Sequence, residues 1–494
     1  MSQTVTTVPP APPGTMQRIP FPLESYQHAS KPLSSKYLLN LMAEQAPADA
    51  RAQVVLIPTA GLELSVTVGS GPIHAINDDI PTRVYVVSGT HFYRLSSPGG
   101  ITQPIEIEDL GDIGTPSGNA PLYLKITIAV GFNGVVVCVP PNAFTSTNNP
   151  GDALNPLGGT FPGNASSVTF LDGYFVFTKM DGTGFFISLL NDPTNFDALD
   201  FASLDAFGNW MYRVVTNGLD LWFAGIAGLE IWYDAGAQDF PFRRRPGGFI
   251  QHPVASPRSV VVGDGSVFWL GLDCIVCRSN GYQPSRISTN AIEEIIREIG
   301  ISDINSALVY SESGHVFYAL NFTSRTLVYD ASTKLWHDRA SSTDGTGRWR
   351  CDASGMKSFP PQVQDWNGTL LGDYQTGALY VPSPRLATDN GVVVKRQAVM
   401  PPLWGGTRRL FCSRLEIEME SGLSTSGSIT LDWSDDGGNT WTGGPRVLAN
   451  PAGQYRYRVF TTRLGSFRQR VFRLTANGNP TMYAVDCAII PGDS

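Results

Sequence analysis

The chain contains 494 residues, of which 16% are charged, 11% are aromatic and 42% are hydrophobic, and its formal net charge is −8. This balance excludes a disordered chain, and it argues against a sequence-specific nucleic-acid binder, which usually carries a basic face. The 51 glycines and 36 prolines favour many strands joined by short turns, because both residues interrupt regular structure.

The chain carries no recognisable targeting or membrane-spanning segment. No run of 18 apolar residues occurs, so we expect no membrane span. Residues 1–14 are rich in threonine and proline and lack the apolar core of a secretory signal, which predicts synthesis in a cytoplasm. The six cysteines do not have the spacing of a compact disulfide scaffold. They are Cys138, Cys274, Cys277, Cys351, Cys412 and Cys487.

Residues 1–50 are predicted to form an extended N-terminal arm. Thr4–Pro13 is a Pro-rich stretch that favours extended chain. Ser34–Gln45 places Leu38, Leu41 and Met42 on one side of a short predicted helix. Because this segment has no evident core of its own, we expect the arm to dock on a neighbouring surface or subunit, and its removal to leave the rest folded.

Residues 51–395 are predicted to form a β-propeller. β-rich runs alternate with glycine-containing turns, and Asn-Gly and Asp-Gly are strong hairpin signals because glycine adopts positive φ. Units of about 40–50 residues with several strands each are typical of propeller blades. The spacing predicts six or seven blades and does not separate the two numbers. The punctuating glycines are Gly89, Gly134, Gly173, Gly218, Gly265, Gly314 and Gly368.

One helix is expected inside this region. In Asn290–Gly300 the isoleucines 292, 295, 296 and 299 share one helical face, and Gly300 is a suitable C-cap. Residues 396–494 differ from the region before them because they contain arginine but no lysine. Strands predicted at 413–419, 428–434, 455–463 and 471–476 indicate a small C-terminal β-sandwich-like domain. The fold class is therefore all-β.

A hairpin turn in the C-terminal domain resembles the Asp-box of sialidase-type propellers. Ser434, Asp436, Gly437 and Trp441 fit the pattern S-x-D-x-G-x-T-W. The aspartate accepts backbone N–H bonds, the glycine takes positive φ, and the tryptophan packs the turn on the sheet. We interpret the motif as a structural turn, and its single occurrence does not establish a sialidase.

No metal or cofactor site is predicted. Cys274 and Cys277 have the spacing of a zinc knuckle, but no second Cys pair or His pair accompanies them, so buried structural thiols are expected. The six histidines show no metal-ligand spacing. Phosphate-binding and nucleophile-elbow motifs are also missing.

Two arginine groups are candidate interaction surfaces. Arg243, Arg244 and Arg245 are predicted to lie in a loop that meets DNA phosphate or an acidic partner, with a solvated loop as the alternative. Arg456 and Arg458 fall on one face of a predicted strand, with tyrosines on the other.

A glycan-cleaving site needs two carboxylates that flank the scissile bond. Nothing in the sequence pairs the candidates with one another, so no catalytic residue is predicted and the chain is expected not to be an enzyme. The candidates are Asp200, Asp205, Asp220 and Glu230.

Several segments, spread over about residues 55–480, together resemble the tail nozzle, or packaged-DNA stabilisation, proteins of P22-like short-tailed phages. Among them are Gly228-Leu-Glu-Ile-Trp-Tyr233, residues 287–296 at the start of the predicted helix, and the Ser-Asp-Asp-Gly-Gly turn at 434–438. The full set comprises residues 61–65, 69–72, 84–89, 228–233, 269–271, 287–296, 327–332, 335–336, 415–418 and 434–438.

This resemblance implies a virion structural protein without catalysis. Such a protein forms a homohexameric ring below the phage portal and its adaptor, extends the DNA channel and retains packaged DNA without reading its sequence. It supports tailspikes or fibres and a tail plug or needle until genome ejection. The resemblance thus places the protein in the virion tail, after synthesis in the host cytoplasm. Two rival interpretations are a glycan-cleaving, sialidase-like propeller and a receptor-binding propeller.

Overall fold

In the computed structural model the chain forms two compact units. The propeller unit comprises residues 62–334 and 348–382, and the sandwich unit comprises residues 1–61, 335–347 and 383–494. The described residues are 16–47, 49–50, 52–80, 83–96, 105–114, 124–204, 210–355, 369–420, 427–442 and 445–491.

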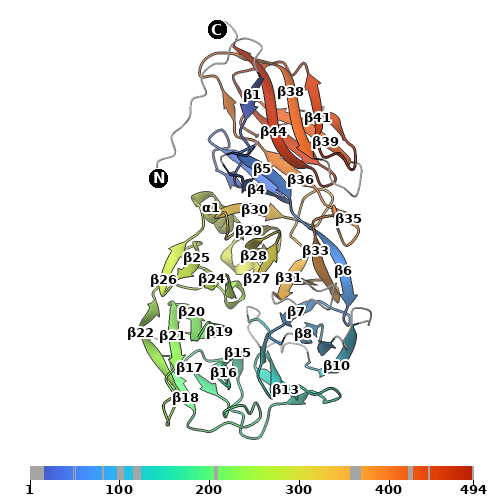
Figure 1. The fold of residues 1–494 in the computed structure, drawn as a ribbon. Coiled ribbons are helices and arrows are strands. Elements are labelled where there is room, and N and C mark those ends of the chain that lie inside the picture. Colours follow the sequence, from blue (N-terminus) through green and yellow to red (C-terminus); the bar gives the residue numbers. More distant parts are fainter. Residues whose placement is uncertain are drawn as a thin grey trace. The chain divides into compact units, whose positions relative to one another are not determined.

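The propeller unit is a ring of antiparallel blades (Figure 1). Blade 1 contains β7 (Ile73–Asn77), β8 (Arg83–Ser88), β9 (His91–Ser96) and β10 (Glu106–Asp112); blade 2 contains β11 (Thr127–Val130), β12 (Gly134–Val139), β13 (Asn142–Thr147) and β14 (Asn155–Pro156). Blade 3 contains β15 (Ala165–Leu171), β16 (Tyr174–Lys179), β17 (Gly184–Ile187) and β18 (Phe201–Ser203); blade 4 contains β19 (Met211–Asn217), β20 (Asp220–Gly225), β21 (Leu229–Asp234) and β22 (Phe242–Ile250).

Three further blades complete the ring. Blade 5 contains β23 (Val261–Gly263), β24 (Ser266–Leu270), β25 (Val276–Asn280) and β26 (Gln283–Arg286); blade 6 contains β27 (Ile304–Glu312), β28 (His315–Phe322) and β29 (Thr326–Asp330). In blade 7, β31 (Cys351–Gly355), β32 (Leu370–Asp373) and β33 (Ala378–Ser383) are joined by β6 (Gly61–Thr67), which comes from the other end of the propeller sequence. The described strands therefore form seven blades, and β6 closes the ring.

The hydrophobic cores of the propeller lie between neighbouring blades. In β12, Val135 and Val137 pack with blade 1, whereas Val136 and Cys138 pack with blade 3. Both faces of the strand are buried, which is why it reads as a continuous apolar run instead of an alternating one. Each fully buried valine or phenylalanine contributes about 1.5–3 kcal/mol. A single blade has no such core, so radial repetition is what makes the unit stable.

The predicted hairpin glycines mark real turns. Gly173, Gly218, Gly265 and Gly314 have positive φ and join the first and second strands of blades 3, 4, 5 and 6. Gly89 also has positive φ, but it joins the second and third strands of blade 1. Two of the predicted set behave differently: Gly134 begins β12 without positive φ, and Gly368 lies outside the described residues.

The expected helix is confirmed as α1 (Asn290–Ile299), where the Thr289 side chain caps the first turn and Gly300 ends the last with φ 98°. Two short 3-10 helices, η2 (Pro257–Ser259) and η3 (Ile301–Asp303), are also present. No helix within the described residues is long and apolar enough to cross a membrane.

The sandwich unit packs two sheets around one core. One sheet has the order β4 (Leu41–Gln45), β5 (Val54–Pro58), β44 (Thr481–Pro491), β38 (Leu410–Glu420) and β41 (Tyr457–Thr462), with β1 (Met16–Ile19) on β44 and β42 (Ser466–Phe467) on β38. The other has the order β30 (Leu335–Arg339), β3 (Ser35–Leu39), β36 (Arg396–Val399), β43 (Gln469–Ala476), β39 (Gly427–Ser434) and β40 (Arg446–Asn450), with β2 (Tyr26–Gln27) on β3 and β37 (Leu403–Trp404) on β43. The short hairpin of β34 (Thr388–Asp389) and β35 (Val392–Val393) also belongs to this unit.

The helix predicted at Ser34–Gln45 is wrong. The segment forms β3 and β4, and Asn40 between them has φ 52°, so the chain passes from one sheet to the other. The Asn40 side-chain amide donates to the carbonyl oxygens of Ala340 and Lys395, both at 2.8 Å. Leu38 and Leu41 are fully buried in the core between the sheets. Apolar residues needed by two opposed sheets produced a spacing that imitates one helical face.

The expected arm at 1–50 differs from the structure in its described part. β1 pairs with β44, and β3 pairs with β36, so residues 16–50 supply strands to the sandwich. Ile19 and Phe21 join Leu38 and Leu41 in its core. Thr4–Pro13 lies outside the described residues. The compact units also depart from the predicted boundaries at 50/51 and 395/396, because residues 335–347 and 383–395 belong to the sandwich unit.

Candidate functional site

The arginine run 243–245 lies in a strand, β22, and not in the predicted loop. Arg244 Nε donates to Glu230 Oε1 at 2.6 Å, and this buried carboxylate also accepts from Trp232 Nε1 at 2.9 Å. The strand register explains the bond between Arg244 and Glu230. Arg244 is opposite Trp232, and Glu230 lies two residues away from Trp232 on the same face of β21. Only Arg243 of the run is exposed without a polar partner among the described residues.

Arg245 is bound to a second carboxylate of the same blade. Its Nε donates to Asp220 Oδ1 at 2.9 Å, while the hydroxyl of Tyr282 donates to Asp220 Oδ2 at 2.8 Å. The guanidinium also lies 4.6 Å from the centre of the Tyr233 ring. Two of the three arginines therefore brace blade 4 by charge-assisted hydrogen bonds.

These contacts also account for two candidate catalytic carboxylates. Asp220 accepts from Arg245 and Glu230 accepts from Arg244, so each carboxylate already has a structural partner. Partial burial, reinforced by the charge of Asp197, raises the pKa of Asp200. The fourth candidate, Asp205, lies outside the described residues.

Arg458 lies in β41 and Arg456 immediately precedes it, and both contact acidic side chains of β38. Arg458 Nε lies 2.9 Å from Glu416 Oε1, and Arg456 Nε lies 3.9 Å from Glu418 Oε1. Arg414 contacts the other oxygen of Glu416 at 2.9 Å. Arg458 is exposed, whereas the neighbouring Tyr457 packs against the sandwich core. Because β41 is an edge strand, the exposed arginines discourage unspecific strand pairing there.

The Asp-box-like turn joins β39 and β40 in the sandwich unit, not two strands of the propeller. Asp436 Oδ1 accepts from the Ser434 hydroxyl at 2.6 Å and from the Thr440 amide at 2.9 Å. These bonds hold the pKa of the Asp436 carboxyl well below its usual range. Gly437 has φ 77°. The Arg473 guanidinium lies over the Trp441 ring, with its Cζ atom 3.9 Å from the ring centre.

The cysteine pair of the zinc-knuckle pattern is buried and free, as predicted. Cys277 lies in β25, whereas Cys274 lies in the preceding turn with φ 67°, so the two are not on one strand. Burial raises the pKa of the Cys277 thiol to about 12. No cluster of three or more potential metal ligands occurs in the part of the chain that the structure describes.

One cysteine pair was not predicted from the sequence. Cys412 and Cys487 form a disulfide between the adjacent strands β38 and β44. The 75 residues that separate them gave no signal, since their proximity depends on the pairing of the two strands.

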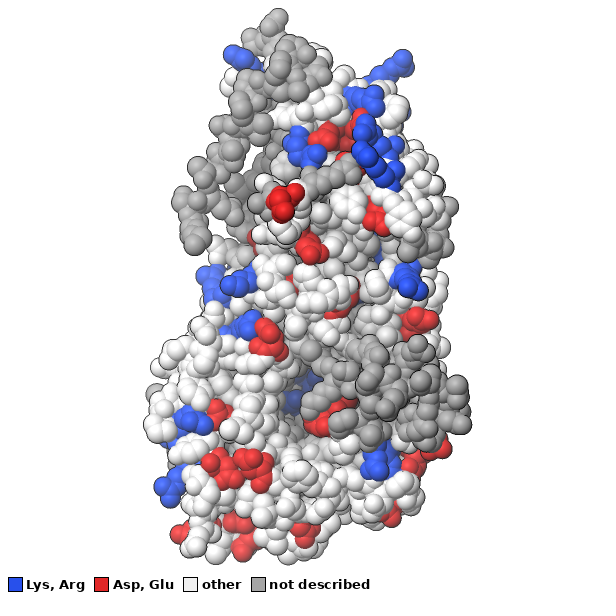
Figure 2. Space-filling view, in the orientation of Figure 1, with Lys and Arg blue, Asp and Glu red and all other residues white. Residues whose placement is uncertain are grey.

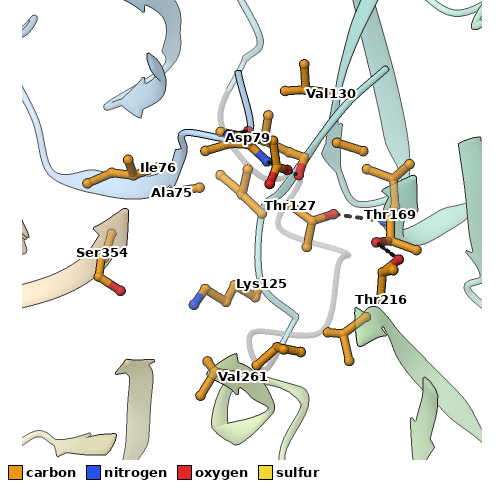
Figure 3. Close-up of a pocket in the computed structure, with 18 of the residues that line it drawn as sticks. Ala75, Ile76, Asp79, Lys125, Thr127, Val130, Thr169, Thr216, Val261 and Ser354 are labelled. Carbon is orange, nitrogen blue, oxygen red and sulfur yellow. Dashed lines mark hydrogen bonds between the residues drawn. The ribbon is translucent and has the colours of Figure 1, made fainter. Parts of the chain in front are cut away.

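The propeller unit contains an axial cavity of about 560 Å³. The first strand of each blade is the inner one, and residues in or next to these seven strands line the cavity. Figure 2 shows the hollow, with atoms of basic residues at its floor. Lys125 extends its ammonium group toward the middle, between Ser354 and Val261 (Figure 3). Arg213 of β19 also lines the cavity, as do Asp78 and Asp79 after β7.

The positive charges in and beside the axial cavity, on Lys125, Arg213 and Arg258, repel one another. Burial, together with the charges of Arg213 and Arg258, lowers the pKa of Lys125 to about 7. Burial also lowers the pKa of Arg213 to about 10. The Cys138 thiol is near Arg213, but burial raises the thiol pKa to about 12, so it supplies no negative charge at neutral pH.

Comparison with known proteins gives a family match for both units. Residues 17–377 match the family model described as bacteriophage P22 Gp10, beta-propeller, and residues 395–489 match bacteriophage P22 Gp10, beta-sandwich. No curated protein sequence gives a significant match.

Three solved structures show distant likeness to this chain. YCF48 bound to a D1 peptide is 11% identical, with 66% of this chain and 97% of that chain covered and a TM-score of 0.39. A catalytically inactive virginiamycin B lyase from Staphylococcus aureus is 9% identical, with coverages of 65% and 98% and a TM-score of 0.42. PorZ of Porphyromonas gingivalis is 12% identical, with coverages of 77% and 46% and a TM-score of 0.36. At these scores the likeness carries no functional conclusion.

Proposed function

The chain belongs to the bacteriophage P22 Gp10 family of phage tail structural proteins, and from this premise we propose that it forms the tail nozzle of a short-tailed phage. The match to both family models, over residues 17–377 and 395–489, carries the proposal. In the proposed role a homohexameric ring attaches below the portal and adaptor, extends the DNA channel and retains the packaged genome until ejection.

Exposed apolar side chains on both units support a role in permanent assembly. On the sandwich unit, Trp404 is 75% exposed and Tyr455 is 72% exposed. On the propeller unit, Phe132 is 77% exposed and Leu199 is 79% exposed. Large apolar residues that remain exposed in one subunit are typical of surfaces that another subunit covers. A ring built by repeating one head-to-tail contact uses two different surfaces of each copy.

The charge of the chain supports passage of DNA without capture. The formal net charge is −8, and four of the five candidate arginines are within 4 Å of a carboxylate. Phosphate capture requires cations that are not already neutralised. We therefore propose that DNA passes the nozzle without sequence recognition, and that tailspikes or fibres and a tail plug or needle are its protein partners. We propose no catalytic step.

The test is a stop codon in this gene of the parent phage, followed by electron microscopy of the particles. Heads that package DNA, lose it and lack the distal tail are the expected result. Complete particles that retain DNA yet fail to adsorb to or digest the host surface would overturn the nozzle and favour a receptor-binding or glycan-cleaving propeller.

A further inference from the structure

Lys125 and Arg213 line the axial cavity, and neither forms an ion pair with a carboxylate of the described residues. Burial and the charges of Arg213 and Arg258 are the influences on the Lys125 ammonium, and no acidic group of the described residues contributes. Asp78 and Asp79 line the same cavity, but Asp79 accepts instead from Asn77 Nδ2 at 2.7 Å. Cations held together without acids are costly to bury unless an anion accompanies them.

Arg213 has donors without acceptors. Its Nε and Nη1 atoms are buried, and neither has a hydrogen-bond partner in the part of the chain that the structure describes. A buried donor left without an acceptor costs about 1–3 kcal/mol, and more when the group is charged. Lys125 Nζ makes one contact, to the carbonyl oxygen of Ala307 at 3.3 Å, so it has two further N–H donors available.

The hydroxyl groups of the cavity are already used to hold the inner strands together. The Thr127 hydroxyl accepts from the Val168 amide at 2.9 Å, and the hydroxyls of Thr169 and Thr216 bond each other at 2.8 Å, as Figure 3 shows. These bonds join β11 to β15 and β15 to β19. The cavity is thus a preformed frame in which Lys125 and Arg213 supply the donors that remain.

We propose that the axial cavity of the propeller binds a small oxyanion of the phosphate class, held by the Lys125 ammonium and the Arg213 guanidinium. The guanidinium offers paired donors whose geometry fits a phosphate oxygen pair, and the ammonium adds a point charge. The cavity of about 560 Å³ is much larger than one ion needs, since a water molecule occupies about 30 Å³ in the liquid. An organic phosphate ester therefore fits as well as inorganic phosphate.

The site is tested on the isolated full-length protein, so its failure is distinguishable from failure of the nozzle proposal. Inorganic phosphate is titrated into the protein by calorimetry at pH 7 and constant ionic strength. We expect saturable binding that Lys125→Met and Arg213→Gln each weaken by about tenfold or more. Arg243→Gln is the matched control, because that guanidinium is exposed and lies on β22, and its affinity should equal that of the unmodified protein. The absence of saturable binding, or unchanged affinity in both cavity variants, overturns the proposal.

A second measurement needs no variant and covers the case in which Arg213→Gln does not fold. Acetic anhydride labels lysines, and mass spectrometry reports each site. Phosphate should protect Lys125 while leaving the exposed Lys334 equally labelled. Equal labelling of Lys125 with and without phosphate contradicts the proposal. Glycerol phosphate and a short single-stranded oligonucleotide, used in place of phosphate, then separate a free phosphate or monoester from a nucleic-acid phosphodiester.

Discussion

Arg244 donates a hydrogen bond of 2.6 Å to Glu230, joining an arginine side chain that is 44% exposed to a carboxylate that is fully buried. The sequence offered the arginine as a surface for DNA and the glutamate as a catalytic candidate. The structure makes each the partner of the other, and that relationship supplies the first test.

Arg244→Ala should destabilise the propeller by about 1–3 kcal/mol, because the buried carboxylate of Glu230 loses a charged donor. Arg243→Ala removes an exposed neighbour with no polar partner and should change stability by less than about 0.5 kcal/mol. Urea unfolding followed by tryptophan fluorescence measures both. Equal effects of the two substitutions would show that Arg244 does not brace blade 4.

Lys125→Met should stabilise the protein in phosphate-free buffer, and the gain should depend on pH. The pKa of Lys125 is lowered to about 7 by burial, with Arg213 and Arg258 adding positive charge, while Asp78 and Asp79 also line the cavity. A lowered amine pKa means that the unfolded chain binds more protons above pH 7, so wild-type stability rises with pH there. The advantage of the methionine variant should be largest below about pH 7 and shrink toward pH 10.5.

Thermal melts of the two proteins at several pH values measure this gain. A constant difference between pH 6 and pH 10 is incompatible with the lowered pKa. Lys334→Met is the control, because Lys334 is exposed on the same unit.

Asp436→Ala should lower the unfolding temperature of the sandwich unit, because Ser434, Asn439 and Thr440 all donate to this carboxylate. The pKa of Asp436 is depressed, so its contribution is present above the ordinary value of 3.8 and is lost as the pH falls below it. Asp436→Asn keeps one side-chain oxygen acceptor and should retain part of the effect. Melting curves at pH 7 and pH 3 measure it; a difference between wild type and Asp436→Ala that is as large at pH 3 as at pH 7 contradicts the assignment.

Leu41→Ala should destabilise the sandwich unit by about 2–5 kcal/mol, because Leu41 is fully buried in its core. Leu33→Ala is the matched control from the same segment, since Leu33 is 65% exposed, and it should have an effect of less than about 0.5 kcal/mol. Hydrogen exchange of β38 and β44 reports the result. If both substitutions leave exchange unchanged, residues 16–50 are not an integral part of the sandwich.

The fold class and the helix α1 were predictable from local signals. Gly173, Gly218, Gly265 and Gly314 recur at the same hairpin of successive blades, so their spacing measures one blade. The number of blades was not predictable in this way. β6 reaches blade 7 from the other end of the unit, and the turn expected around Gly368 lies outside the described residues.

The axial site could not be found in the sequence. Lys125 precedes β11 and Arg213 lies in β19, and each is a lone basic residue in an apolar stretch. Only closure of the ring brings them to one cavity. The helix predicted at Ser34–Gln45 was wrong for a related reason, because its leucines are buried between two sheets that contain the distant strands β36 and β44. The local spacing of apolar residues indicates which of them are buried, but it does not indicate which distant strands bury them.

The closing strand β6 sets an order on synthesis. β6 leaves the ribosome before any blade, yet its partner β33 is made more than 300 residues later. Elongation at about 5–20 residues per second leaves the edge of β6 unpaired for tens of seconds while blades 1 to 6 accumulate. The ring can close only when translation of this unit is nearly complete. A nascent chain that stalls in between is an open arc with an unpaired β6 and uncovered apolar faces on its end blades, so truncated products should be the aggregation-prone species in expression of this protein.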